Sequence, residues 1–196
     1  MQQFKKFLPW IILGIIALWG IAKYNGMVGK DQEVKKTWAD VESDYQRRMD
    51  LIPNLVNTVK GYANFEQETL TKVVEARAKA TSVNIDPSNL TPDKLAQFQQ
   101  AQDGVSSALG RLMVVMEKYP DLKANQNFLD LQAQLEGTEN RISVARKRFN
   151  EAVQTYNSAI LGFPSNLVAM VGGFKEKGFF KSAEGADKAP TVDFGK

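Results

Sequence analysis

Asp50-Leu51-Ile52-Pro53-Asn54-Leu55-Val56 marks the point where two helical patterns meet, and the other segments are arranged around it. Before this stretch, apolar residues recur at steps of three and four, at Val34, Trp38, Val41, Tyr45 and Met49. This spacing places them on one helix face and does not fit the alternation of a half-buried strand. Pro53 has no amide donor and disfavours helix at Ile52, so the sequence predicts a kink or a restart there. The pattern then continues to about Ala80, with Gly61 inside it.

Two more amphipathic segments follow a loop at residues 81–90. Thr91 is expected to cap a helix that starts at Pro92. Its stripe contains one polar member and runs through Leu95, Phe98, Gln102, Val105, Leu109, Leu112, Met116 and Tyr119. After a turn at residues 121–125, another stripe extends from Phe128 to Ile160, and residues 166–174 form a short apolar helix or turn. The predicted fold is all-α: an N-terminal transmembrane helix followed by an up-and-down antiparallel bundle of three to four long helices.

Residues 7–24 form the predicted membrane anchor, after a short flank at residues 1–6. Phe7 to Ala22 is a run of sixteen uncharged residues between Lys6 and Lys23. A bilayer core needs roughly 17–25 apolar residues, and flanking lysines and aromatic side chains extend such a run to the interfaces. A cleaved signal peptide is the alternative, since it also has a basic start and an apolar middle. The bundle domain is assigned to residues 25–180 and a loose tail to residues 181–196.

Positive charge on both sides of the anchor leaves its orientation open. Lys5, Lys6 and the amino terminus favour a cytoplasmic N-terminus, with the bundle outside the cytoplasm. Lysines after the anchor count for the opposite orientation, at positions 23, 30, 35 and 36. We expect the bundle on the extracytoplasmic side.

Composition excludes several classes of site. The 196-residue chain contains no cysteine and no histidine, which removes disulfides, thiolate nucleophiles, imidazole bases and the metal sites that need those ligands. The formal net charge is only +3, and basic and acidic residues are interspersed along the predicted helices, so no nucleic-acid partner is expected. No nucleophile elbow, phosphate-binding loop or dinucleotide fingerprint is present, and neither a cofactor nor a metal is predicted.

Polar clusters on the helices are the remaining candidates. Arg47, Arg48 and Asp50, like Glu75 and Arg77, form either a binding site or an ion-paired helix surface.

The later clusters leave similar alternatives open. Glu136 and Glu139 share a helix face, which suggests a cation site, a solvated face or a buried polar layer. Asn150 and Asn157 are seven residues apart and would fix helix register or subunit pairing, or lie at a bundle edge. The last group either touches a membrane surface or packs on the end of the bundle: Phe163, Phe174, Phe179 and Phe180 with Lys175, Lys177 and Lys181.

Together these segments resemble the LemA family. The resemblance rests on RRMDLIPNLV (47–56), VKGYA (59–63), EAR (75–77), YPDLKAN (119–125) and ENRI (139–142), with Arg146, Tyr156-Asn157, Phe163-Pro164 and Gly173-Phe174. The ending APTVDF (189–194) also resembles a frequent family tail. The resemblance implies a bacterial membrane protein with one transmembrane helix and a helical bundle, and it implies no enzymatic activity. The candidate interface residues are Arg47, Arg48, Asp50, Pro53, Asn54, Lys60, Tyr62, Glu75, Arg77, Tyr119, Lys123, Asn125, Glu139, Asn140, Arg146, Asn150, Tyr156 and Asn157.

Three functions are compatible with this pattern. The leading hypothesis is a homo-oligomeric scaffold anchored in the bacterial inner membrane, without catalysis. The alternative is a monomeric accessory module that binds a membrane enzyme or an envelope protein. The third is a hydrolase that uses the carboxylates of Glu75, Glu136 or Glu139.

Overall fold

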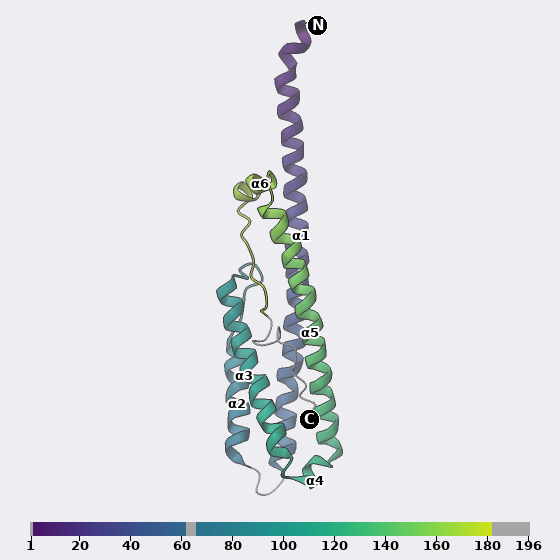
Figure 1. The fold of residues 1–196 in the computed structure, drawn as a ribbon, viewed down its shortest axis with the longest axis vertical. Helices are drawn as coiled ribbons and strands as arrows, with labels where there is room; N and C mark the ends of the chain where they lie inside the picture. The colour runs from purple at the N-terminus through teal and green to yellow at the C-terminus, as the bar shows by residue number, and fades with distance from the viewer. Residues whose placement is uncertain (1, 62–65, 182–196) are drawn as a thin grey trace, which may run out of the picture.

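A computed structural model describes residues 2–61 and 66–181, and these ranges contain six helices and no strand. The helices are α1 (Gln2–Lys60), α2 (Gln67–Ser82), α3 (Pro92–Met116), α4 (Pro120–Lys123), α5 (Gln126–Leu161) and α6 (Ser165–Gly172). Figure 1 shows α1 extending over the whole length of the molecule, with α5 antiparallel beside it. The predicted all-α bundle is therefore confirmed.

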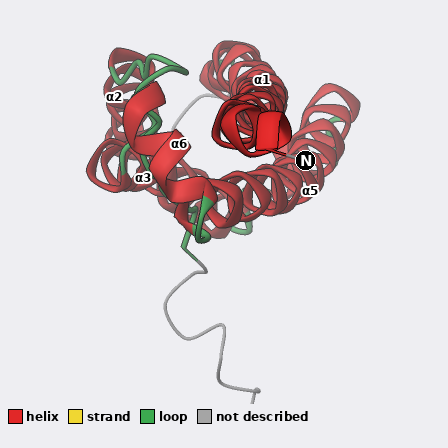
Figure 2. Ribbon diagram, turned by 90° about the horizontal axis from the view of Figure 1, so that it is seen from above, coloured by secondary structure: helices red, strands yellow, loops and turns green. Residues whose placement is uncertain are grey.

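The bundle has two halves with different numbers of helices. α2 and α3 pack mainly on each other and form a hairpin that covers the half of α1 and α5 farther from the N-terminus (Figure 1). In the half nearer the N-terminus, α1 and α5 are joined by α6 and by residues 174–181. Seen along the bundle, α6 lies across the end nearest the N-terminus (Figure 2).

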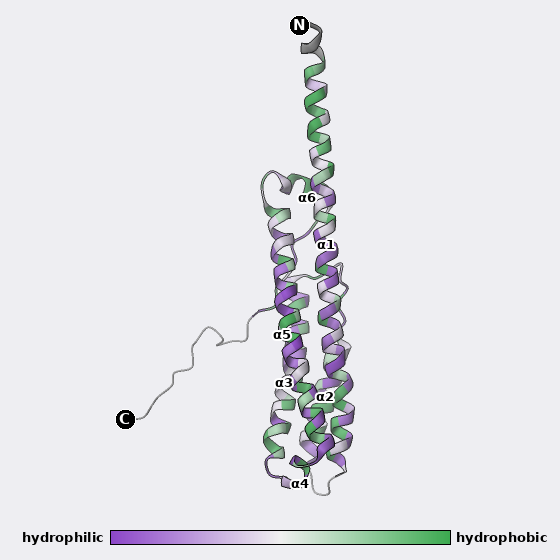
Figure 3. Cartoon of the chain, turned by 90° about the vertical axis from the view of Figure 1, so that its right-hand side faces the viewer, coloured by the Kyte–Doolittle hydropathy of each residue, from purple (hydrophilic) through white to green (hydrophobic). Residues whose placement is uncertain are grey.

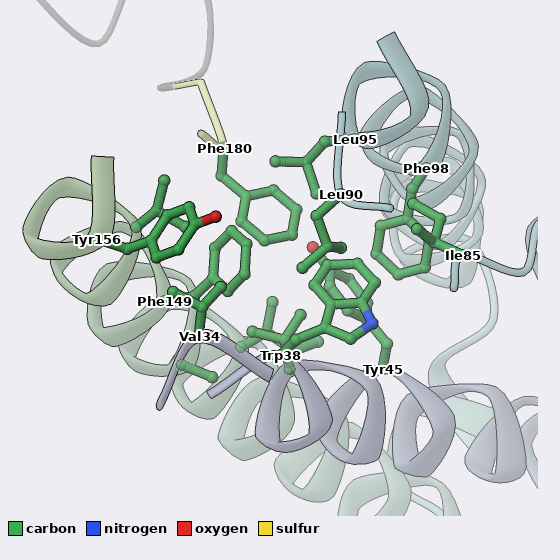
Figure 4. Packing of buried hydrophobic residues seen from close by; sticks show 14 of the residues in the cluster. Val34, Trp38, Tyr45, Ile85, Leu90, Leu95, Phe98, Phe149, Tyr156 and Phe180 are labelled. Atoms are coloured by element: carbon green, nitrogen blue, oxygen red, sulfur yellow. The ribbon is translucent and has the colours of Figure 1, made fainter. Parts of the chain in front are cut away.

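Each half has its own apolar core. The far core contains Ile52, Leu55, Val105, Leu112 and Phe128, which are buried members of the predicted stripes. The near core is aromatic and is centred on Trp38 (Figure 4). The Trp38 ring lies edge-on to Phe98 and Phe149, with centroids 5.2 and 5.5 Å apart, and Phe180 stacks on it at 6.1 Å.

The expected restart at Pro53 does not occur, because α1 continues as one helix to Lys60. The interruption comes after Lys60, and α2 begins at Gln67. Gly61, which was expected inside a helix, lies in a turn. Tyr62 falls outside the residues that the structure describes.

Arg77 explains why α1 continues through Pro53, one of its two internal prolines. Pro53 cannot donate to the carbonyl of Met49, four residues earlier, so this carbonyl loses its helical partner. The Arg77 Nε–H on α2 donates to that same Met49 oxygen at 2.9 Å. A side chain from the neighbouring helix thus replaces the missing amide, and α1 is not divided at Pro53.

Several predicted boundaries are confirmed. α3 begins at Pro92, and the Thr91 hydroxyl accepts from the Lys94 amide at 3.5 Å. The expected turn at residues 121–125 is partly helical, because α4 occupies Pro120–Lys123. The short apolar helix expected at residues 166–174 is α6. The predicted loose tail lies outside the described residues from position 182 onward.

Among the described helices, one is long and apolar enough to cross a membrane, and the apolar window is the N-terminal part of α1. Its large apolar side chains from Phe7 to Ile21 are exposed; Tyr24 contacts Phe174, and full burial in the bundle begins at Met27. Figure 3 shows this hydrophobic segment projecting beyond the bundle. Because α1 has no break between Ala22 and Met27, the segment and the bundle share one helix.

We predict that Arg77 and Pro53 are energetically coupled. Arg77→Ala should lower the free energy of unfolding by about 1–3 kcal/mol, because it leaves the Met49 carbonyl without its partner. In a Pro53→Ala background the restored amide can bond that carbonyl, so the same change should cost about 1 kcal/mol less. Urea denaturation of the four proteins of this double-mutant cycle measures the coupling. Exposed Arg47→Ala is the control, and equal costs in both backgrounds would refute the explanation.

Candidate functional site

A buried arginine connects three helices between the two apolar cores. Arg48 on α1 is 1% exposed. Its Nη1 donates to Ser106 Oγ on α3 at 2.9 Å and also to the Glu139 carboxylate on α5. Its Nη2 donates to Gln102 Oε1 at 2.7 Å and to the Gln102 carbonyl at 3.2 Å. The guanidinium carbon lies 5.0 Å from the centre of the Tyr45 ring.

This polar layer corrects the interpretation of Arg48 as part of an ion-paired surface. The guanidinium is enclosed, and its two Nη groups reach a carboxylate, a hydroxyl and an amide that come from two other helices. A buried charge is costly unless it is paired and hydrogen-bonded, so these contacts favour the register of α1, α3 and α5 in which all three partners reach Arg48. Of the alternatives weighed for Glu139, the buried polar layer is closest, although the Glu139 side chain remains partly exposed.

The two asparagines predicted to share a face of α5 hold the C-terminal strap, which we define as the extended residues 174–181. Asn157 accepts from the Lys177 amide at 3.0 Å and donates to the Lys177 carbonyl at 2.9 Å. Asn150 makes the same pair of bonds with Phe180, at 2.9 and 3.0 Å. Each side-chain amide therefore satisfies both backbone groups of one strap residue.

The spacing of these two pairs follows from backbone geometry. Seven residues along α5 span about 10.5 Å at 1.5 Å per residue. Three residues of extended chain, from Lys177 to Phe180, span about 10 Å. The strap runs antiparallel to α5, so the two distances match and both asparagines bind at once. The seven-residue recurrence of asparagine sets the register of the strap on the helix.

Further contacts fix the end of the strap against α3 and α5. Gln99 on α3 donates to the Lys181 carbonyl at 3.0 Å and accepts from its amide at 3.1 Å, and Arg146 on α5 donates to the same carbonyl at 2.8 Å. The Gly178 amide donates to the Leu90 carbonyl at 2.9 Å. A Cβ at Gly178 would lie 2.7 Å from Pro92 Cα, so this close approach requires glycine.

A buried ion pair joins the strap to α1. Lys177 Nζ lies 2.7 Å from Asp31, which also pairs with Lys35 at 2.8 Å. Burial by itself raises the pKa of the Asp31 carboxyl, but the hydrogen bonds and charges of Lys177 and Lys35 outweigh it and hold the pKa below its usual value. Burial, together with the nearby Asp31 carboxylate, raises the pKa of Tyr156 to about 12. Tyr156 therefore stays neutral and donates to the Lys175 carbonyl at 3.0 Å.

These contacts show which of the C-terminal aromatic and basic residues pack on the bundle and which remain exposed. Phe180 and Lys177 are buried in the bundle, as expected for a segment that packs on it. Phe174 packs edge-on against Tyr24 of α1, with ring centroids 5.4 Å apart. Phe163 and Phe179 remain exposed.

The other candidate residues fall into two groups. Asn125 caps α5 by accepting from the Phe128 amide at 3.2 Å, and Tyr119 is half-buried beside α4. The exposed candidates are Arg47, Asp50, Pro53, Asn54, Lys60, Glu75, Lys123 and Asn140. Lys123 pairs with Glu117 at 2.6 Å, and Asp50 accepts from Gln46 at 2.7 Å.

Asn140 lies on a charged groove between α1 and α5 that faces away from the α2–α3 hairpin. We call it the outer groove. Asp40 and Asp44 of α1 line one side of it, and Arg141 and Arg148 of α5 line the other. Within the described part of the chain, none of these four side chains forms an ion pair with another residue.

The carboxylates considered for hydrolysis do not form an enclosed pair. Glu75 and Glu136 are exposed on different helices, and Glu136 accepts from Gln132 at 3.0 Å. Glu139 is engaged by Arg48. Among the residues that the structure describes, no cluster of three or more potential metal ligands occurs. The arrangement gives the hydrolase hypothesis no support.

Sequence reasoning missed Asp31 and Gln99, and it named Lys177 in the C-terminal group without its partner. One signal was available for the polar layer, since Gln102 interrupts the apolar stripe of α3. No pattern marks Lys177, because its partner Asp31 is far away in the sequence.

We predict that Asn157 is essential for seating the strap. Asn157→Ala should lower the free energy of unfolding by about 2–4 kcal/mol, because two buried backbone groups of Lys177 lose their partners. Hydrogen exchange at the Lys177 and Phe180 amides should accelerate as well. Asn140→Ala, an exposed asparagine of the same helix, should change stability by less than about 0.5 kcal/mol. Similar effects from both substitutions would contradict the role of the strap contacts.

Comparison with known proteins adds the family. Residues 37–194 match the model of the LemA family. "Protein LemA" of Metamycoplasma hominis is 25% identical, in an alignment that covers 89% of this chain and 76% of that protein. "Magnetosome protein MamQ" of Magnetospirillum gryphiswaldense and "Magnetosome protein MamQ 2" of Paramagnetospirillum magneticum are each 26% identical, with coverage of 85% of this chain and 68% of theirs. Since the family match spans most of the chain, including the helices that build the polar layer and hold the strap, this protein belongs to the LemA family.

Proposed function

We propose that this protein is a membrane-anchored, self-associating scaffold of the bacterial inner membrane and that it carries out no catalysis. The observation that carries the proposal is the outer groove, which presents a row of acids on α1 beside a row of arginines on α5. The motif residues inside the bundle are engaged in building it, as Arg48, Arg77 and Asn157 show. Self-association therefore needs a surface other than these internal residues, and the outer groove offers one.

The two rows of the groove lie at matching heights. Arg48 of α1 bonds Glu139 of α5, and Trp38 of α1 packs on Phe149 of α5. The helices are antiparallel, so a residue of α1 and a residue of α5 lie at the same level when their two residue numbers add up to nearly the same total as in these pairs. By this register Asp40 is level with Arg148, and Asp44 is level with Arg141. Each acid of α1 thus has a basic neighbour at its own level across the groove.

Membrane anchoring then restricts how two copies can meet. Two molecules in one membrane must be related by an axis along the membrane normal, so residues meet at equal heights. Rotation by 180° about such an axis brings α1 of one copy opposite α5 of the other. Asp40 and Asp44 then face Arg148 and Arg141 of the second copy, and the reverse contacts form by symmetry. The groove is complementary to itself in the arrangement that an anchor permits.

The relatives support association with a membrane structure. Two of them are named as magnetosome proteins, and each is 26% identical to this chain over most of its length. We propose that the shared property is a bundle fixed to a membrane by its first helix.

Charge reversal tests the self-association. Full-length Asp40→Lys/Asp44→Lys should weaken association in mild detergent by about 100-fold or more, because like charges then face each other. Arg141→Glu/Arg148→Glu should do the same. An equimolar mixture of the two variants should restore association, since each basic row again meets an acidic row. Light scattering or native mass spectrometry over micromolar concentrations measures the mass.

Asp130→Lys/Glu136→Lys is the matched control, because it makes the same charge change at exposed positions elsewhere on α5. It should leave the mass unchanged. A monomeric wild-type protein would refute the scaffold proposal and favour the accessory-module alternative. Failure of the mixture to associate would remove the outer groove as the interface.

We also propose that the bundle lies on the extracytoplasmic side of the membrane, because Lys5, Lys6 and the amino terminus precede the anchor. The chain has no cysteine, so single-cysteine variants can be labelled selectively. Val114→Cys, on the exposed surface of α3, should react with a membrane-impermeant maleimide in cells whose outer barrier is permeabilised. Reaction only after the inner membrane is broken would place the bundle in the cytoplasm.

A further inference from the structure

An exposed apolar patch surrounds α6. Its members, which we call the α6 patch, are Leu161, Phe163, Leu167, Met170 and Val171. Val171 is 91% exposed, Phe163 is 84% exposed and Met170 is 76% exposed. Isolated apolar residues on a surface are ordinary, but five within eleven positions concentrate exposed apolar surface at α6, and such surface marks interaction sites.

The sequence around the patch carries no charge. No Asp, Glu, Lys or Arg occurs between Glu151 and Lys175, whereas such residues make up 24% of the whole chain. An uncharged stretch of this length is unlike the solvated helix surfaces of the far half of the bundle. It matches what a surface needs where it meets lipid.

The patch lies beside the end of the membrane-spanning segment. α6 packs on α1, and Phe174 at its C-terminal side contacts the ring of Tyr24. The packing is close, because a Cβ at Gly172 would approach the Tyr24 ring to 3.0 Å and the Phe174 ring to 2.7 Å. Figures 1 and 2 show α6 next to α1 at the end of the bundle from which the N-terminal segment emerges.

The depth of α6 follows from this contact. The uncharged run of α1 ends at Ala22, and Tyr24 is two residues farther, about 3 Å along the helix. Each headgroup layer of a bilayer is roughly 5–7 Å thick outside a hydrocarbon core of about 30 Å. With Ala22 at the edge of the hydrocarbon, Tyr24 and the adjoining α6 lie at headgroup level. Tyrosine is itself enriched at that depth.

We propose that the α6 patch inserts into the boundary between headgroups and acyl chains of the bilayer that α1 crosses. α6 is then a second membrane contact, which the chain makes about 145 residues after the first. The lipid would cover the apolar side chains that the bundle leaves exposed, as for amphipathic helices that lie in the interface. With the α1 anchor as its single membrane contact, the bundle could rotate about the anchor helix. A second contact at α6 would fix the orientation of the bundle relative to the membrane surface.

The inference rests on membrane anchoring by α1, so the test must report on both. Single-cysteine variants of the full-length protein are labelled with an environment-sensitive fluorophore. They are reconstituted in vesicles of phosphatidylethanolamine and phosphatidylglycerol that carry nitroxide lipids at a shallow or a deep position. Val171→Cys probes the patch, and Ile15→Cys probes the anchor. Val114→Cys, at an apolar position that is 70% exposed near the far end of α3, is the matched control.

The shallow nitroxide should quench the Val171 label at least threefold more than the Val114 label, and the deep nitroxide should quench the Ile15 label best. Strong quenching at Ile15 with equal, low quenching at Val171 and Val114 would overturn the α6 proposal while retaining the anchor. Low quenching at all three positions would overturn both. Protection of the Val171 label from aqueous iodide without lipid quenching would show that protein covers the patch, and this too would overturn the proposal.

Discussion

Coverage of Trp38 is the constraint on which the near half of this structure depends. α1 and α5 form a two-helix layer there, and the near end of the α2–α3 hairpin covers one side of it with Ile85, Leu90, Leu95 and Phe98. Two helices cannot enclose a large aromatic side chain by themselves. The chain solves this after α5 by turning back along the bundle, so that Phe180 stacks on the Trp38 ring. An extended segment exposes its amides and carbonyls, and the asparagines of α5 satisfy these groups where they face the helix. The strap is thus a part of the core and not an appendage.

The buried charges divide this core and give it one register. Arg48 separates the two apolar clusters, and Lys177 with Asp31 fixes the strap on α1. Long amphipathic helices with similar stripes can slide by a turn at little cost, because one apolar residue replaces another. A slip here would leave Arg48 without the Gln102 and Glu139 oxygens that it needs. The register in turn sets Asp40 level with Arg148, so the internal polar layer determines what the outer groove presents.

The helices could be predicted from the sequence because burial on one face imposes a period that neighbouring residues reveal. Thr91-Pro92 and the stripe from Phe128 to Ile160 gave correct boundaries for this local reason. Of the kink or restart expected at Pro53, the restart does not occur, because Arg77 on a different helix gives the Met49 carbonyl a donor that the local rule does not consider. Asn150 and Asn157 were recognised as a pair, but their partner was not, because extended residues 174–181 have no periodic pattern. The pairing of Lys177 with Asp31 depends on a contact across 146 positions. The local sequence does not encode it.

Anchor, groove and α6 together limit the geometry of any assembly. α1 is one helix from its apolar N-terminal segment to the far end of the bundle, so a tilt of this segment tilts the whole outer groove with it. In the proposed arrangement α6 extends to one side of α1 at headgroup level, and lipid contact there would resist such tilting. An upright bundle keeps equal residues of two copies at equal heights, which the complementarity of Asp40 and Asp44 with Arg148 and Arg141 requires. The apolar patch at the membrane end and the charged outer groove therefore serve the same proposed assembly. Membrane contact fixes the orientation of the bundle, and this orientation allows the outer grooves of two copies to pair.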